Sequence, residues 1–381
     1  MYNAYKFRLY PNTNQLELIN RMFGCNRFIY NYYLDKIKKN GYNSVYSNIS
    51  DYVNNLKYDY PFLQEVDSII IRKSLFNLDT AFKKMFNEHA GYPRFKSKFS
   101  RNSYSTNAIY NRYYNKEYCN IELDLGNRMI KLPKLKWIKI RGYRNIDKIL
   151  GRIKSATISK ESNGKYYVSV LYEISDKMID KVKPRKVVGI DLEIKKLLTL
   201  SDGTSYDNNK YIEKYEKRIK RKQRELSRKI KGSKNYYKCK LELARLHSKL
   251  ANSRKYYLHQ ITKYLTDEYD IISCETLSLK DMIANGKKNH LSKSLNDTCF
   301  NKIIEMLKYK SLRKGKYFIT IDKYYPSSQM CSKCNHQDNK YKKLEYREYA
   351  CRECGLKLDR DLNASINIMF EGVKEYMKIL V

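Results

Sequence analysis

KVVGIDLEIKKLLTLSDG, residues 186–203, contains two short apolar runs with charged residues between them. The first run is rich in β-branched residues and ends at the carboxylate of Asp191, and the second, residues 197–200, ends just before the turn dipeptide Asp202-Gly203. This pattern predicts a buried strand that carries an acid, followed by its hairpin partner. A carboxylate in such a strand must be solvated, paired or bound to a cation, because burying it alone is costly. For Asp191 taken alone, a surface acid at a strand end is the simpler interpretation.

Two further acids occupy similar settings. Glu275 follows the apolar run YDIISC, residues 269–274, which predicts a second buried strand. Asp359 and Asp361 lie at the start of LDRDLNASINIMF, which predicts a last helix. Two residues apart at a helix start, they point about 200° away from each other, so only one of them can join the other acids. Asp359 suits the N-cap, and Asp361 is the candidate third ligand.

Four of the nine cysteines form a metal-binding pattern. CSKC and CREC supply Cys331, Cys334, Cys351 and Cys354, and two C-x2-C pairs separated by sixteen residues fit a four-thiolate zinc site. Such a closed site is structural and leaves no open position for chemistry. His336 is interpreted as a bystander, because four thiolates already complete the site. The other five cysteines are scattered, which suits reduced thiols better than a disulfide framework.

Length and composition limit the kind of protein. The chain has 381 residues, of which 42% are hydrophobic, so it has room for two or three domains and a substantial core. The sequence does not open with a charged segment followed by an apolar one, and it has no run of about eighteen apolar residues. We therefore expect a soluble, cytoplasmic protein with no membrane partner.

The charge of the chain is strongly positive. Lys and Arg number 77 against 40 Asp and Glu, which gives a formal net charge of +37. A chain this positive repels itself unless it meets a polyanion, so nucleic acid is the expected partner. The codon bias of an AT-rich genome is an alternative explanation for the abundance of Lys. It does not explain why Asp and Glu are so much less numerous than Lys and Arg.

Basic residues are densest in one segment. Residues 211–260 contain seventeen Lys and Arg against four Glu, together with an apolar stripe at helical spacing and a break at Gly232-Ser233. This pattern predicts two helices in a hairpin that forms an electrostatic track for nucleic acid. The alternative is a solvated face, although solvated helices normally mix the two signs of charge.

In the first part of the chain, the spacing of the apolar residues changes from that of a strand to that of a helix. Residues 5–10 alternate like a strand, and Asn12 with Gln15 resembles the capping box of a helix. Apolar residues then recur at helical spacing up to Gly91, which predicts a helical subdomain whose exposed cations could contact phosphates.

Residues 92–182 predict a small all-β module. Asn163-Gly164 indicates a two-residue hairpin turn, and a long loop at residues 94–116 interleaves cations with tyrosines. That combination suits phosphate contact and base stacking. The four strand-like runs are residues 129–132, 135–140, 153–159 and 166–172.

Several of these stretches resemble TnpB, the transposon-encoded nuclease family related to the compact type V CRISPR effectors. They are VVGID at Asp191, SCETLSLKDM at Glu275, YYPSSQMCSKC with CREC, and DRDLNASINI at Asp361. Upstream, GYPRFKSK, LPKLKWIKIRG and ATISKESNGKYYVSVLYE resemble the β-barrel of the same family. The resemblance covers nearly the whole chain.

The resemblance implies an α+β multidomain fold. An N-terminal β-barrel with an inserted helical lobe would precede an RNase H-like (RuvC-type) α/β nuclease domain that is interrupted by a zinc ribbon. The implied segments are a first barrel strand at 1–11, a helical recognition lobe at 12–91, a wedge-like β-barrel at 92–182, a RuvC-like domain at 183–322 with the basic hairpin at 211–265, a zinc ribbon at 323–356 and a last RuvC-like segment at 357–381.

The activity that the resemblance implies is RNA-guided DNA cleavage. The protein would bind a guide RNA transcribed from the element's own end, as a monomer with that RNA. It would cut double-stranded DNA beside a short flanking motif in the prokaryotic cytoplasm, where it would associate with the nucleoid. Three carboxylates from two strands and a helix can hold two Mg²⁺ ions about 4 Å apart. Asp191 would bridge both ions, with Glu275 and Asp361 completing one site each.

The sequence departs from the family pattern at Glu193, where Gly is common, and also at Thr276, Gln329 and Asn335. Glu193 can face the same side as Asp191 and is a candidate auxiliary ligand. Because the three acids are intact, an active nuclease is expected. The alternatives are a nuclease-inactive, guide-RNA-dependent repressor, an unguided RNase H-type transposase or resolvase, and a non-enzymatic zinc-ribbon binding protein.

Overall fold

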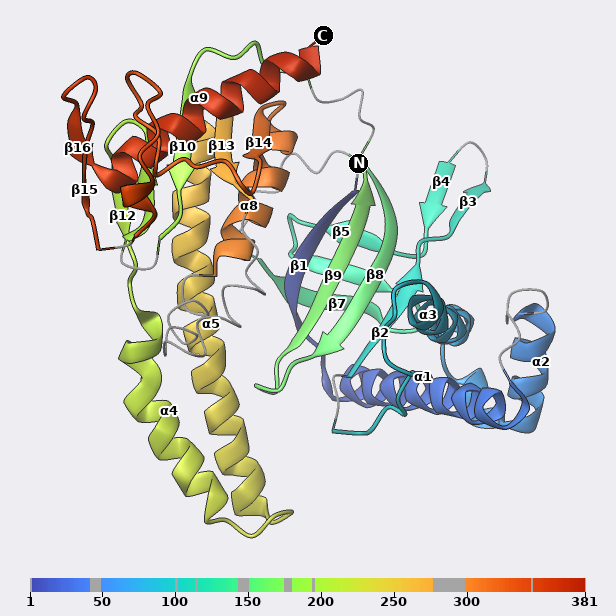
Figure 1. Cartoon of the computed structure of the whole chain (residues 1–381). Helices are drawn as coiled ribbons and strands as arrows, with labels where there is room; N and C mark the ends of the chain where they lie inside the picture. Colours follow the sequence, from blue (N-terminus) through green and yellow to red (C-terminus); the bar gives the residue numbers. More distant parts are fainter. Residues whose placement is uncertain are drawn as a thin grey trace. The chain divides into compact units, whose positions relative to one another are not determined.

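The computed structural model describes residues 2–41, 49–99, 102–113, 116–142, 151–174, 180–193, 196–276, 299–343 and 345–380. The chain divides into two units, Met1–Asp176 and Lys177–Val381, both drawn in Figure 1. No helix within the described ranges is long and apolar enough to cross a membrane.

A seven-stranded antiparallel sheet forms the centre of the first unit (Figure 1). Its strands lie in the order β2-β8-β9-β1-β7-β6-β5, and β3 and β4 form a separate pair. The strands are β1 (Tyr2–Tyr10), β2 (Asn102–Asn107), β3 (Tyr110–Tyr113), β4 (Lys116–Cys119), β5 (Glu122–Asp124), β6 (Met129–Leu132), β7 (Lys136–Arg141), β8 (Arg152–Lys160) and β9 (Tyr166–Glu173).

Helices pack against this sheet and share one apolar core with it. The capping box predicted at the start of the first helix is confirmed, because the Asn12 side chain accepts from the Gln15 N–H (2.9 Å) and the Gln15 side chain accepts from the Asn12 N–H (3.1 Å). The helices are α1 (Thr13–Asn40), α2 (Ile49–Asp59) and α3 (Ser68–Asn87), with the short 3₁₀-helix η2 (Pro61–Gln64) between the last two.

The predicted β-barrel is wrong for the residues that the structure describes. The edge strands β2 and β5 do not pair with each other, and a closed barrel requires that pairing. The reason lies at β2, where the Asn26 amide of α1 donates to the Ser103 carbonyl (2.8 Å) and the Arg27 guanidinium donates to Asn102 (3.3 Å). Helix α1 thus occupies the strand edge that a barrel would have to pair with another strand.

Two local predictions in this unit are also wrong. The segment 94–116 is not one long loop, because it contains β2 and β3, and Tyr104 of β2 is buried in the core. The hairpin of β8 and β9 exists, but Lys160 pairs with Tyr166, so its loop spans residues 161–165 instead of two residues.

A five-stranded sheet forms the centre of the second unit, in the order β12-β11-β10-β13-β14 (Figure 1). β10 runs parallel to β13 and β13 parallel to β14, whereas β11 is the antiparallel hairpin partner of β10, as the sequence predicts. The strands are β10 (Val187–Asp191), β11 (Lys196–Leu200), β12 (Ser205–Asp207), β13 (Ile271–Glu275) and β14 (Tyr317–Ile321), and a second small sheet pairs β15 (Glu348–Ala350) with β16 (Lys357–Asp359).

Helices cover both faces of the five-stranded sheet. Val188 and Ile190 of β10 form one apolar cluster with residues of α5 and α8. Gly189, which alternates with them along the strand, instead meets the backbone of α9. The helices of this unit are α4 (Tyr211–Ser227), α5 (Lys234–Glu268), α8 (Phe300–Arg313) and α9 (Arg360–Leu380), with the 3₁₀-helix η4 (Asn339–Lys342).

Two glycines let α9 approach the sheet closely. A Cβ on Gly189 would lie 2.1 Å from the Ser365 carbonyl oxygen of α9, and a Cβ on Gly372 of α9 would lie 1.8 Å from the Ser273 hydroxyl of β13. Both contacts are far below the van der Waals distance, so any side chain at these positions would push the helix away. The two glycines therefore set the distance between α9 and the strands β10 and β13.

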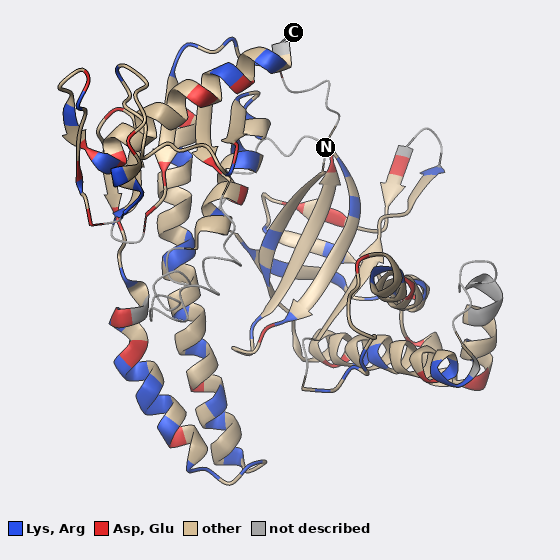
Figure 2. Ribbon diagram, in the orientation of Figure 1, with Lys and Arg blue, Asp and Glu red and all other residues tan. Residues whose placement is uncertain are grey.

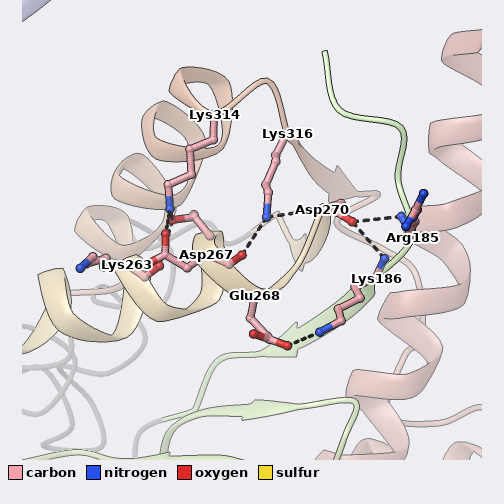
Figure 3. A network of polar contacts seen from close by, with 9 residues as sticks. Arg185, Lys186, Lys263, Asp267, Glu268, Asp270, Lys314 and Lys316 are labelled. Carbon is pink, nitrogen blue, oxygen red and sulfur yellow. Dashed lines mark hydrogen bonds and ion pairs between the residues drawn. The ribbon is translucent and has the colours of Figure 1, made fainter. Parts of the chain in front are cut away.

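A polar network ties the three parallel strands together at the ends where they begin (Figure 3). Asp270 precedes β13, and its carboxylate accepts from the backbone N–H groups of Arg185 (3.0 Å) and Lys186 (3.1 Å) ahead of β10. The Lys316 ammonium ahead of β14 lies 3.1 Å from the same carboxylate, and these two side chains are 13% and 14% exposed. Although burial opposes the shift, these hydrogen bonds and Lys316 lower the pKa of Asp270.

Replacing Asp270 with Asn should destabilise the second unit by about 2–4 kcal/mol, because it leaves the Lys316 ammonium without its charge partner and turns one acceptor into a donor. The measurement is thermal and urea unfolding at neutral pH. The matched control is Glu268→Gln, which breaks an ion pair with Lys186 whose two side chains are 41% and 61% exposed. We expect the control to cost less than about 1 kcal/mol.

The difference between the wild type and Asp270→Asn should also depend on pH. Because the folded pKa of Asp270 is lowered, its stabilisation is complete above the unfolded value of about 3.9 and is lost as the pH falls through the folded value. An equal loss in the Glu268→Gln control, or a difference that persists at very low pH, would contradict the role assigned to Asp270.

Candidate functional site

The three predicted acids come from neighbouring elements of the second unit. Asp191 is the last residue of β10 and Glu275 the last of β13, and these strands are parallel neighbours in which Ile190 pairs with Cys274. The two acids therefore lie side by side at the carboxyl edge of the sheet. Asp361 lies in the first turn of α9, the helix that Gly189 allows to lie close against β10.

Negative charge is concentrated at this edge. Burial raises the pKa of Asp191 well above its ordinary value, and the carboxylates of Glu275, Asp361 and Glu193 raise it further, with Arg360 opposing them. Burial also raises the pKa of Glu275, against the hydrogen bond that it accepts from Ser327. Carboxylates that face each other in poorly solvated surroundings favour a proton or a cation between them. The structure thus brings the three predicted acids together.

The predicted division of labour between Asp359 and Asp361 agrees with the hydrogen bonds at the start of α9. The Asp359 carboxylate accepts from the backbone N–H groups of Asp361 (3.0 Å) and Leu362 (3.1 Å), which is the arrangement of an N-cap. Asp359 is therefore engaged with its own helix, whereas the charge of Asp361 contributes to the raised pKa of Asp191.

Glu193 is a fourth acid of this group. Its carboxylate accepts from the Lys196 N–H (3.0 Å), and burial, followed by the charge of Asp361, raises its pKa. Arg347 lies 3.4 Å from Glu193 and 3.8 Å from Asp361, so one guanidinium faces both carboxylates. Sequence reasoning identified Glu193 but not Arg347, because nothing in the pattern separates this arginine from the other cations.

Arg347 owes its position to the small sheet of β15 and β16, which links the ribbon, defined as residues 323–356, to the residues just ahead of α9. It directly precedes β15, which pairs with β16, and β16 continues into α9. The Arg347 carbonyl also accepts from the Arg360 N–H (2.8 Å). The ribbon thereby places a cation beside the acids at the start of α9.

The four predicted cysteines gather at one point of the ribbon. The ligand sulfurs of Cys331, Cys334, Cys351 and Cys354 all lie within 4.8 Å of one another, and the Cys331–Cys354 and Cys334–Cys351 pairs are each 3.5 Å apart. A tetrahedron of thiolates about 2.3 Å from a zinc ion has edges close to this length. These donors therefore fit a metal ion such as zinc.

The backbone after each Cys pair and the closeness of the four sulfurs both distinguish the cysteine site from the group of acids. Asn335 and Gly355, which directly follow the two Cys pairs, have φ values of 60° and 70°, a left-handed conformation that Asn and Gly adopt more readily than other residues. Among the residues that the structure describes, the four cysteines are the group of three or more His, Cys, Asp or Glu whose ligand atoms lie close enough to hold a metal ion.

The predicted hairpin is formed by α4 and α5, which are joined by residues 228–233. Lys and Arg residues recur along both helices (Figure 2). We define the α4 patch as four exposed cations spaced three or four residues apart, which places them on one helix face about 16 Å long. They line a shallow hollow of this helix and are Lys217, Arg221, Arg224 and Arg228.

Three family models match parts of the chain. Residues 169–286 match a model described as "Probable transposase", residues 300–368 match "Cas12f1-like, TNB domain", and residues 1–44 match "Helix-turn-helix domain". In the described part of the last match, the chain forms strand β1 and the single long helix α1.

Curated proteins resemble the chain over nearly its whole length. A protein of Streptomyces pristinaespiralis named "Putative RNA-guided DNA endonuclease" is 32% identical over 97% of this chain and 89% of its own length. The Escherichia coli K12 protein InsQ, with the same description, is 31% identical over 97% of this chain and 92% of its own.

Solved structures share the fold at low sequence identity. The chain in a cryo-EM structure of a Cas12f1-sgRNA-target DNA complex gives a TM-score of 0.59 at 14% identity, with 97% of this chain and 98% of that chain covered. The structure of the mini-RNA-guided endonuclease CRISPR-Cas_phi3 gives a TM-score of 0.53 at 10% identity. The match covers 98% of this chain and 92% of that chain. The likeness therefore extends across both units.

Proposed function

Because the chain belongs to the TnpB family, we propose that it is an RNA-guided DNA endonuclease encoded by a transposable element. It binds a guide RNA from the element end and cuts double-stranded DNA next to a short flanking motif by phosphodiester hydrolysis. The observation that carries this proposal is the meeting of Asp191, Glu275 and Asp361 at the carboxyl edge of the second sheet. The helices of residues 12–91 serve as the recognition lobe, and the second unit as the RuvC-like nuclease.

The acids act as metal ligands in this proposal. Two Mg²⁺ ions about 4 Å apart would, when bound, supply an activated water and stabilise the leaving 3′ oxygen. Both Glu275 and Asp361 raise the pKa of Asp191, which supports assigning Asp191 to both ion positions. Glu275 and Asp361 come from different elements and complete one position each. Four cysteines hold one Zn²⁺, which has a structural role.

The decisive experiment identifies the RNA that the protein carries. The protein is expressed with its native flanking DNA and purified in high salt, and the bound RNA is sequenced. One discrete RNA from the locus boundary with a variable 3′ segment is expected, and it provides the guide for an assay of Mg²⁺-dependent cleavage. A heterogeneous mixture of RNAs, or none, contradicts the proposal and favours an unguided transposase or resolvase. A discrete RNA without cleavage indicates a guide-dependent repressor.

The α4 patch should contribute to nucleic acid binding through phosphate contacts. Changing all four of its cations to Ala should lower the slope of log affinity against log salt concentration by about 3, since each phosphate contact accounts for about 0.7–0.9 of that slope. The measurement is a titration of guide RNA and of duplex DNA at several salt concentrations.

The control for the α4 patch changes Lys374 and Lys378 of α9 to Ala. These lysines are 67% and 69% exposed and are paired with Glu371 and Glu375, so they are less available to phosphates. The control should leave the slope nearly unchanged. Equal effects of both sets of changes would show that the salt dependence reflects net charge and not a track on α4.

A further inference from the structure

Two asparagines on α9 are almost completely buried although their side chains are polar. Asn363 is 0% exposed and Asn367 is 2% exposed, and their spacing of four residues puts both amides on the same face of the helix. A buried amide is costly unless its donors and acceptor find partners. The partners of these two amides therefore show what this face of α9 holds in place.

The partners are backbone groups of the segment that enters the first Cys pair, residues 327–332. Asn363 donates to the Met330 carbonyl (2.7 Å) and accepts from the Ser332 N–H (3.0 Å). Asn367 donates to the Ser327 carbonyl (2.8 Å) and to the Met330 carbonyl (2.8 Å). The two side chains thus fix a piece of irregular backbone against the helix that carries Asp361.

Ser327 is fixed at every polar group that it has. It is 5% exposed, its N–H donates to the Tyr325 carbonyl (2.9 Å) and its carbonyl accepts from Asn367. Its hydroxyl donates to Oε1 of Glu275. A hydroxyl held this firmly limits the orientations of the carboxylate that it contacts, and it leaves the second carboxylate oxygen available.

We propose that Ser327 is a positioning residue that orients the Glu275 carboxylate for metal binding, and that Asn363 and Asn367 hold Ser327 in place. The inference rests on the proposed function, in which Glu275 is a ligand of Mg²⁺. It explains why α9 carries two buried amides next to its acid. It also connects the ribbon to the acids, because Met330 and Ser332 flank the first cysteine of the ribbon.

The main test replaces Ser327 with Ala in the protein–guide RNA complex. The Mg²⁺ concentration that gives half of the maximal single-turnover cleavage rate should rise about 10–100-fold, as is usual when a residue that orients a metal ligand is lost. Affinity for Mn²⁺, measured by calorimetry without DNA, should fall by a similar factor. Ser327→Thr keeps the hydroxyl and should restore both values.

The matched control is Ser365→Ala. Ser365 of α9 is also fully buried, but its hydroxyl donates to the Leu362 carbonyl of its own helix (2.8 Å). Its loss should leave the Mg²⁺ requirement unchanged at a similar change in melting temperature. A second variant, Asn367→Asp, removes the amide that holds the Ser327 carbonyl and should raise the Mg²⁺ requirement in the same direction.

The outcomes separate this inference from the proposed function. If the wild type cleaves and Ser327→Ala has an unchanged Mg²⁺ requirement, the inference is wrong and the proposed function stands. If the wild type does not cleave, the Mn²⁺ titration decides. Weaker binding in Ser327→Ala than in Ser365→Ala supports the positioning role without cleavage, and equal binding refutes it.

Discussion

Replacing Asp191 with Asn should reduce the rate of Mg²⁺-dependent cleavage of guide-matched DNA by about 1,000-fold or more, which corresponds to about 4 kcal/mol of transition-state stabilisation. The amide keeps the shape of the side chain but loses the negative charge that we propose serves both ion positions. Binding of guide RNA should be retained, because the change lies in β10 and not in the α4 patch. The measurement is single-turnover cleavage together with RNA affinity.

A second, independent prediction concerns the stability of Asp191→Asn as a function of pH. Since burial and neighbouring acids raise the pKa of Asp191, the metal-free protein loses stability as the pH rises from the unfolded value of about 3.9 through the folded value. Asp191→Asn removes this loss, so its melting temperature without metal should exceed that of the wild type at neutral pH and match it at low pH. Mg²⁺ should stabilise the wild type more than the variant.

Asp359→Asn is the matched control for Asp191→Asn. Asp359 belongs to the same cluster of acids in the sequence, but it caps α9, and Asn caps a helix about as well as Asp. Cleavage and the Mg²⁺ effect on melting temperature should both persist in this control. Full cleavage by Asp191→Asn, or equal losses in both variants, would show that Asp191 is not a metal ligand.

Local patterns were enough to predict much of the second unit. The apolar run ending at Asp191 and its hairpin partner are β10 and β11, and the acid that follows the run at 269–274 lies in the parallel neighbour β13. These elements are recognisable because each is a short apolar run that ends in a charge or turn. That their two acids lie next to each other depends on the pairing of β10 with β13, which the sequence pattern does not give.

The errors concern contacts between distant parts of the chain. Whether a sheet closes into a barrel depends on what its edge strands meet, and the contact of Asn26 with Ser103 joins residues 77 positions apart. The strand β2 also lacks an apolar run, since its sequence is NSYSTN, so it was interpreted as part of a loop. The side chains of β2 alternate between buried and partly exposed in the structure, where β2 pairs with β8, and the sequence of β2 alone does not show this alternation.

The sequence pattern does not identify Arg347 and Ser327, because their roles also depend on contacts between distant parts of the chain. Each touches an acid that is distant in sequence, Arg347 at Glu193 and Ser327 at Glu275, and neither residue type is rare or specially spaced. The asparagines at 363 and 367 lie within a stretch that was recognised, but only the structure shows that they are buried. The signal that could have found them is a pair of amides four residues apart within a mainly apolar stretch of a helix.

Replacing Cys351 with Ser should remove the proposed metal from the ribbon and unfold the part around the cysteines, because the ribbon has little apolar core of its own. Its apolar cluster consists mainly of the cysteines with Tyr341 and Tyr349, and its strand β15 pairs with β16, which follows the ribbon, with three residues in each strand. A sheet of this size is not stable alone, so the proposed metal would supply much of the folding energy. Zinc content should fall from about one ion per chain to nearly none.

Unfolding of the ribbon should also disturb the group of acids, because the ribbon carries Arg347, which contacts Glu193, and Ser327, which contacts Glu275. Cleavage in Cys351→Ser should fall by at least about 100-fold, the combined effect expected when residues that orient metal ligands are displaced. Zinc is measured by elemental analysis, and unfolding of residues 323–356 by hydrogen exchange. Cys119→Ser is the control, since Cys119 lies in the first unit outside the four sulfurs, and it should keep both zinc and cleavage. Cleavage at the wild-type rate by a zinc-free protein would show that the acids hold their arrangement without the ribbon, which would contradict the coupling inferred from Ser327.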